Sequence, residues 1–200
     1  DEAARYNCKP GDIKLATDGS FNDKGIHTYS NKTDYFILGK KTPDWILGFQ
    51  NNFTYRDFDL SFFIMARWGF MVNNDVITRY NPTTSWDNSP TGIDYWTPEN
   101  QGAYLPRPGL HEQKSNYVGF SSLAYMDGSY VKVKNITLGY SLPKKCLAKI
   151  HMEKLRVYAT AYDPFIFAKE ELMRDLDPER NGASNFPLTK RFVFGVNVTF

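Results

Sequence analysis

Hydrophobic and polar residues alternate with a period of two along several segments of the chain. Successive side chains of a β-strand point to opposite faces, so this alternation predicts strands with one apolar face. The longest run covers residues 58–70, roughly 40 Å at ~3.4 Å per residue, and tilted by ~45° it would cross an apolar band of ~25 Å. One face of this run is apolar and is predicted to face lipid: Phe58, Leu60, Phe62, Ile64, Ala66, Trp68 and Phe70.

Four further segments are predicted to be strands on the same evidence: residues 45–55, 129–141, 154–162 and 191–200. The connection Arg56-Asp57 is short enough for a tight antiparallel hairpin. After Leu142-Pro143, the segment 144–150 can form one helical turn.

The connections alternate between short turns and long loops, as they do in membrane β-barrels. We therefore expect an all-β fold: the antiparallel strands of a large transmembrane β-barrel, with long extracellular loops and short periplasmic turns. The expected segments are a hairpin (43–70), a long extracellular loop (71–128), a second hairpin (129–162), a second extracellular loop (163–190) and a terminal strand (191–200).

Sequence motifs spread along the whole chain resemble those of one family, the SusC/RagA-type TonB-dependent outer-membrane transporters, in their C-terminal part. The most specific motif is DGSYVKVKNITLGY at 127–140, followed by Leu142-Pro143. The others are PGDIK at 10–14, TPDW at 42–45 with Gly48-Phe49, YRDFDLS at 55–61, YWTPEN at 95–100, DPE at 177–179 and the terminal strand. The sequence departs from the family at 17–25, where an acidic segment is usual.

The resemblance implies TonB-dependent import of nutrients across the outer membrane of a Gram-negative bacterium, with glycans or oligosaccharides as the first expectation and peptides as the second. It implies several partners: a SusD-like surface lipoprotein, the TonB–ExbB–ExbD complex, the remaining barrel and plug of the transporter, and outer-membrane lipid. Five to seven strands cannot close such a barrel, so we expect the chain to be a C-terminal part of a longer polypeptide.

Two groups of residues are candidate sites within this interpretation. Aromatic residues of the long loop could contact substrate or a lid protein, although they could equally hold the loop together: Trp86, Tyr95, Trp96 and Tyr104. The terminal strand, with an aromatic or aliphatic residue at every second position, resembles a barrel-assembly signal: Phe192, Phe194, Val196, Val198 and Phe200.

Composition excludes several other classes of protein. The 200 residues carry 24 Lys and Arg against 22 Asp and Glu, a balance without the basic excess of a nucleic-acid-binding protein. No stretch approaches the ~20 apolar residues of a membrane helix. No cofactor motif, metal-ligand spacing or catalytic constellation is present, so we expect no cofactor, no metal and no enzyme activity. The acidic residues between 170 and 179 alternate with basic ones and are predicted to be a solvated loop.

One alternative remains open at this point, a soluble extracellular β-sandwich that binds carbohydrate. It predicts that Phe62, Ile64 and Trp68 lie in a protein core, whereas the barrel predicts that they face lipid.

Overall fold

The computed structural model describes residues 9–12, 21–26, 34, 36–80, 92, 94–108, 122–147, 152–173, 176–185 and 188–200. The chain divides into two compact units: residues 1–39 with 73–126, and residues 40–72 with 127–200. No helix in the described ranges has the length and hydropathy needed to span a bilayer.

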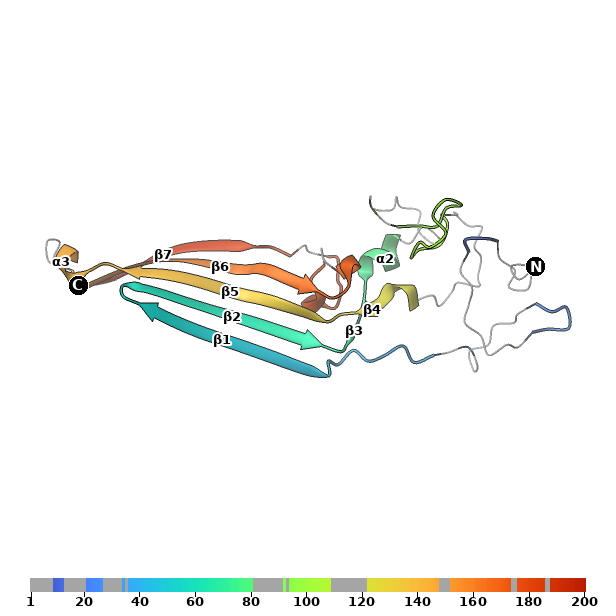
Figure 1. The fold of residues 1–200 in the computed structure, drawn as a ribbon, viewed down its shortest axis with the longest axis horizontal. Coiled ribbons are helices and arrows are strands. Elements are labelled where there is room, and N and C mark those ends of the chain that lie inside the picture. The colour runs from blue at the N-terminus through green and yellow to red at the C-terminus, as the bar shows by residue number, and fades with distance from the viewer. Residues whose placement is uncertain are drawn as a thin grey trace. The chain divides into compact units, whose positions relative to one another are not determined.

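The second unit is a five-stranded antiparallel sheet with the order β1-β2-β5-β6-β7 (Figure 1). Its strands are β1 (Trp45–Tyr55), β2 (Phe58–Trp68), β5 (Tyr130–Ser141), β6 (Lys154–Ala168) and β7 (Arg191–Thr199). Each strand pairs with the next strand of the order in antiparallel register. The prediction of an all-β, antiparallel fold is therefore confirmed, and the strands of the described residues do not close into a barrel.

Both predicted short connections lie at the same end of this sheet, opposite the end where the long loops leave it (Figure 1). Between β1 and β2 the two-residue turn has Arg56 at φ 55°, the left-handed backbone conformation that tight hairpin turns use. Between β5 and β6 the predicted helical turn is present as α3 (Lys144–Leu147).

Short elements make up the rest of the described chain. β3 (Met71–Asn73) pairs with β4 (Tyr125–Asp127). Asn74 caps α2 (Asp75–Tyr80), because its side-chain oxygen accepts from the N–H groups of Val76 and Ile77. The 3₁₀ turns are η2 (Ser122–Ala124), η4 (Glu171–Met173) and η5 (Pro178–Arg180).

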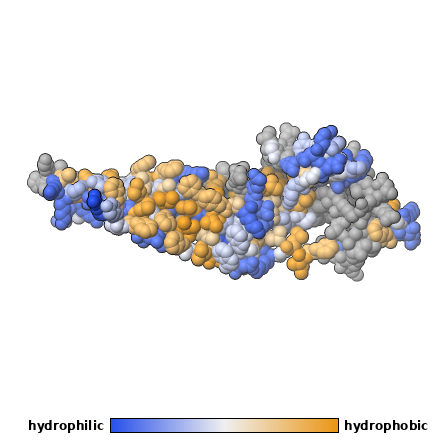
Figure 2. Space-filling view, viewed as in Figure 1, coloured by the Kyte–Doolittle hydropathy of each residue, from blue (hydrophilic) through white to orange (hydrophobic). Residues whose placement is uncertain are grey.

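The strand register separates the two faces of the sheet. One face, which we call the apolar face, carries Phe58, Leu60, Phe62, Ile64 and Trp68 of β2. Their partners on the neighbouring strands are apolar or aromatic, except for Asn51 of β1, which lies opposite Phe62. Among the ladder positions of the five strands this face holds no Asp, Glu, Lys or Arg. Figure 2 shows hydrophobic residues gathered over the middle of the sheet, with hydrophilic residues toward the end that carries α3.

Two features differ from the sequence-based expectation. Phe70, placed on the apolar face with a lipid-facing role, lies beyond the end of β2 and is only 2% exposed, packed edge-on against Tyr130. The alternation stops before it because Gly69 adopts a φ of 75°, which turns the chain out of the strand. The other difference is β6, which continues to Ala168 rather than ending at 162.

Strand β6 can continue past Tyr162 because a β-bulge accommodates Asp163-Pro164. Asn135 pairs with Tyr162 and Val133 with Phe165, so two residues of β6 lie opposite the single Lys134. Asp163 has a φ of 50°, and a bulge is one of the few places in a sheet where proline is tolerated. The loop predicted at 163–190 therefore begins only after Ala168.

Candidate functional site

The apolar face is unusual because many of its large side chains are exposed in the described chain. On β7, the side chains of Phe192 and Phe194 are 68% and 80% exposed, and on β6 Phe167 is 63% exposed. A soluble protein rarely leaves a continuous apolar surface of this kind uncovered. Within the described residues only this sheet and the short β3–β4 pair are present, so no second sheet covers the face as a β-sandwich would require.

Aromatic residues mark both ends of the apolar face. Trp45 and Trp68 stack with ring centroids 5.9 Å apart at the loop end. At the hairpin end, Phe58 and Tyr140 have ring centroids 4.7 Å apart, beside the exposed Tyr55. The 11 residues of β2 between these ends span roughly 34 Å, and a tilt of ~45° reduces this to about 24 Å, close to the ~25 Å apolar band between the aromatic girdles of outer-membrane barrels.

The opposite face of the sheet, which we call the polar face, carries charged residues, and several of them form ion pairs. Near the hairpin end, Arg156 donates from Nε to Oδ1 of Asp59 at 2.8 Å and from Nη2 to the other carboxylate oxygen at 2.5 Å. This pair lies directly over Gly139, where an added Cβ would collide with both side chains. The ring of Tyr158, beneath the Arg156 guanidinium, lies over Gly195 in the same way.

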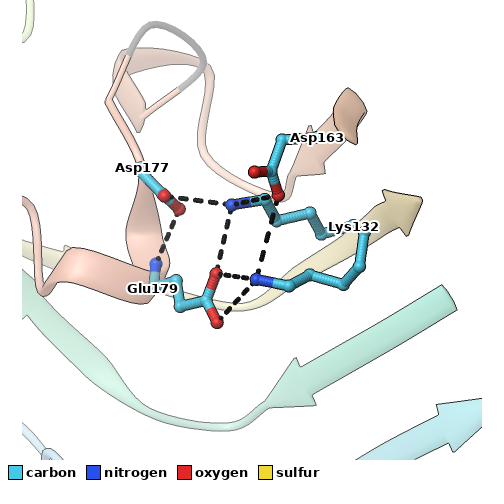
Figure 3. Close-up of polar contacts among 5 residues, drawn as sticks. Lys132, Asp163, Asp177 and Glu179 are labelled. Atoms are coloured by element: carbon cyan, nitrogen blue, oxygen red, sulfur yellow. Dashed lines mark hydrogen bonds and ion pairs between the residues drawn. The ribbon is translucent and has the colours of Figure 1, made fainter. Parts of the chain in front are cut away.

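Near the loop end of the polar face, two lysines of β5 meet three carboxylates in what we call the ion cluster: Lys132, Lys134, Asp163, Asp177 and Glu179 (Figure 3). The Nζ atom of Lys132 lies 3.0 Å from Asp177, 3.1 Å from Glu179 and 3.2 Å from Asp163. Its side chain is only 2% exposed, so nearly all of its interactions are with protein.

Lys134 reaches the same cluster from the bulge. Its Nζ atom lies 2.7 Å and 3.0 Å from the two carboxylate oxygens of Glu179, and 3.8 Å from Asp163. On the other side of β5, Asn135 pairs with Phe63 of β2 and Val133 with Ile64, so Lys134 has no partner on β2. The alternation of faces along β5 shifts by one residue there, and Lys132 lies on the polar face together with Asn135.

The loop contributes its two carboxylates from a well-defined turn. Asp177 caps η5 by accepting from the backbone N–H of Glu179 at 3.1 Å, while its other oxygen binds Lys132. Pro178 occupies the first turn, where its missing N–H costs nothing, and Asn181 ends it in the left-handed region at φ 57°. The DPE motif therefore forms a capped turn that presents both acids to β5.

Electrostatics keep Glu179 ionised in this position. Partial burial opposes its charged form, but hydrogen bonds from Lys134 and Lys132 outweigh that effect and hold the pKa of Glu179 below its ordinary value. The prediction that the acidic residues at 170–179 form a solvated loop is therefore wrong for Asp177 and Glu179. Asp175, in the same run, lies outside the described residues.

The aromatic residues predicted to contact substrate fall into different environments in the first unit. The ring of Trp96 lies where a Cβ on Gly11 would be, so this tryptophan of the YWTPEN motif packs against the glycine of the PGDIK motif. Tyr95 and Tyr104 are 43% and 45% exposed, and the hydroxyl of Tyr104 donates to the carbonyl of Leu123 at 2.7 Å. Trp86 lies outside the described residues. A contact of any of them with substrate stays a prediction.

The residues of the predicted assembly signal lie on one face. Phe192, Phe194, Val196 and Val198 share the apolar face of β7, and Phe200 follows the strand with 82% exposure. Their recognition by an assembly machinery stays a prediction. Among the described residues no group of His, Cys, Asp and Glu has the arrangement of a metal site.

Curated relatives of this chain are TonB-dependent receptors. The chain is 28% identical over 181 residues to TonB-dependent receptor P3 of Formosa agariphila, and 29% identical over 187 residues to TonB-dependent receptor SusC of Bacteroides thetaiotaomicron. These alignments cover 84% and 90% of the chain but 17% of each relative, so the chain spans about a sixth of their length. No protein-family model matches the chain.

Solved structures give the same result for the fold. The RagAB peptide transporter matches with a TM-score of 0.68 at 22% identity, over 92% of this chain and 20% of that one. The RagAB peptide importer in its open-open state matches with a TM-score of 0.63 at 23% identity, over 86% and 19%. The resemblance to SusC/RagA-type proteins is confirmed, and the relatives' names are those of receptors and transporters, which supports the prediction that the chain is not an enzyme.

Proposed function

We propose that this chain forms part of the wall of an outer-membrane β-barrel that imports nutrients in a TonB-dependent manner. The apolar face would contact lipid, and the polar face would line the water-filled interior. The observation that carries the proposal is the exposed apolar face, continuous over five strands and without a charged residue at any ladder position. The aromatic pairs at its two ends fit the two interfaces of a membrane.

The partners follow from the same proposal. A SusD-like lipoprotein would deliver cargo at the loop end of the sheet, TonB–ExbB–ExbD would supply energy, and further strands and a plug would complete the transporter. The relatives named SusC and RagAB support this assembly. The proposed cargo is a glycan or oligosaccharide, with peptide as the alternative that the similar peptide importer supports.

The test of the lipid-facing role uses two substitutions on the same strand of the whole protein. Ile64→Arg, on the apolar face, should cost about 2–4 kcal/mol near the middle of the bilayer and block stable insertion, whereas Ser61→Arg, on the polar face, should be tolerated. The readout is the amount of protein in the outer-membrane fraction that only detergent extracts. Equal insertion of the two variants, or recovery of the protein in the soluble fraction, would overturn the proposal.

Cargo is tested separately in cells that carry or lack the gene. Loss of growth on defined oligosaccharides, with growth on peptides unchanged, would support the glycan proposal; the opposite result would assign peptides.

A further inference from the structure

The loop between β6 and β7 folds back onto the polar face of the sheet. Met173 is completely buried, Asp177 is 6% exposed, and Pro178 is among the most buried residues of the described chain. Beneath them Lys132 of β5, which contacts Asp177 and Glu179, is 2% exposed. The loop therefore covers this lysine.

The ion cluster is what joins this loop to the strands. Lys132 contacts the carboxylates of Asp177 and Glu179 in the loop and of Asp163 in the β6 bulge. Lys134 contacts both carboxylate oxygens of Glu179. A buried lysine in a ring of carboxylates is stable only while its partners stay in place, because an unpaired buried charge is strongly destabilising. Release of the loop would leave Lys132 with Asp163 alone among these three acids.

We propose that the turn at residues 177–180 is a permanent lining of the transport passage, held against the polar face by Lys132, and that it limits the size of the cargo that passes. Lys132 is a positioning residue in this arrangement: it acts by holding the loop. The proposal rests on the proposed function, in which the polar face lines the passage, and it adds a residue and a segment that determine specificity.

The first experiment measures how firmly the loop is held in the intact, detergent-solubilised protein. Lys132→Met removes the cation and keeps most of the side-chain volume, so protease cleavage within residues 176–185 should accelerate about tenfold or more. Lys132→Arg keeps the charge and should retain most of the protection. Lys144→Met removes an exposed lysine of α3, at the other end of the sheet, and should cleave like the unmodified protein.

The second experiment measures specificity in cells. With Lys132→Met, the uptake of long oligomers relative to short ones should rise, while Lys144→Met leaves the ratio unchanged. A merely structural role of Lys132 would lower uptake of all lengths together and leave the ratio as it was.

Two results would overturn the proposal: cleavage of Lys132→Met at the rate of the Lys144→Met control, or faster cleavage with an unchanged length ratio. If Lys132→Met does not reach the membrane, the double variant Asp177→Asn and Glu179→Gln decides, because both changes lie in the loop outside the strands. Loop protection is measured on the protein itself, so a failure of the proposed transport function, seen as absence from the outer membrane, is distinguished from a failure of this inference.

Discussion

The two faces of the five-stranded sheet are formed by the same strands but differ in their charged residues. On the apolar face, no charged side chain occupies a ladder position, and large side chains such as Phe194 are exposed. The polar face carries charged residues, among them the pairs Arg156 with Asp59 and Lys132 with Asp177. In a soluble protein the apolar face of a sheet is the buried one. In this sheet large residues of the apolar face are exposed, and the buried lysine, Lys132, lies on the polar face.

The largest expected effect comes from placing one charge on each face of β7. Phe194 and Val193 are adjacent apolar residues on opposite faces, so they form a matched pair. Phe194→Arg should destabilise the inserted protein by about 2–4 kcal/mol if it lies near the bilayer midplane, while Val193→Arg should cost much less. Urea titration of the protein folded in lipid vesicles measures both. Equal costs would contradict the assignment of faces.

A smaller effect is expected from adding volume to the polar face. The ring of Tyr158 occupies the space above Gly195, and a Cβ there would collide with it. Gly195→Ala should therefore cost about 1–3 kcal/mol through displacement of the ring. Gly102→Ala is the control, because no atom lies within 4 Å of the corresponding Cβ position. The same urea titration applies, and an unchanged midpoint for Gly195→Ala would contradict the packing described for Tyr158.

Acid should loosen the ion cluster without disturbing the apolar face. The pKa of Glu179 lies below its ordinary value of 4.5, so the stability from its pairs with Lys132 and Lys134 is fully present above that value and is lost as pH falls through the lowered pKa. Asp163 and Asp177 also face Lys132 and add to the cluster's charge balance.

Protease cleavage within residues 176–185 should therefore stay slow from pH 7 to about 5 and accelerate only in stronger acid, with an acid-stable protease as the probe. Glu179→Gln should remove most of this pH dependence. Loosening between pH 7 and 6 would contradict the direction of the pKa shift.

The smallest effect is expected at an exposed ion pair. Lys169 lies 2.5 Å from Asp127, and this hydrogen bond raises the pKa of Lys169 and helps to lower that of Asp127 against the opposing effect of burial. The lysine side chain is about half exposed, so solvent and salt screen the pair. Lys169→Met should leave the urea midpoint unchanged within measurement error. A clear fall of the midpoint would show that exposure does not decide the strength of this pair.

The sequence predicted the strands and their faces because alternation is a local property. Alternation of apolar and polar residues was enough to predict the strands at 45–55 and 58–68. The short connection Arg56-Asp57 was enough to predict that they form a hairpin. The expectation that these strands belong to a larger barrel came from the family motifs, because alternation within this chain does not reveal strands outside it.

The ion cluster could not be found in that way, because its partners are distant in the chain. Lys132 and Asp177 are 45 residues apart, and nothing in the acidic run distinguishes the two residues that fold back from those that do not. The phase change was also hidden: counted back from Tyr140 in strict alternation, Lys134 and Lys132 fall on the same side as Ile136. One signal could have indicated the cluster: the DGSYVKVKN motif contains two lysines and the DPE motif two acids, and the predicted fold gave neither pair of charges a partner.

The extra residue at Lys134 also determines which changes of length strand β5 can absorb. Deletion of Lys134 would leave Val133 and Asn135 as neighbours on opposite faces, as their pairing with Ile64 and Phe63 of β2 already places them. Deletion of a paired residue on either side of Lys134 would instead move every side chain between the deletion and the bulge to the opposite face of the sheet. Aliphatic side chains would then lie on the polar face and a lysine on the apolar face. Natural variants that shorten this strand by one residue should therefore do so at the bulge.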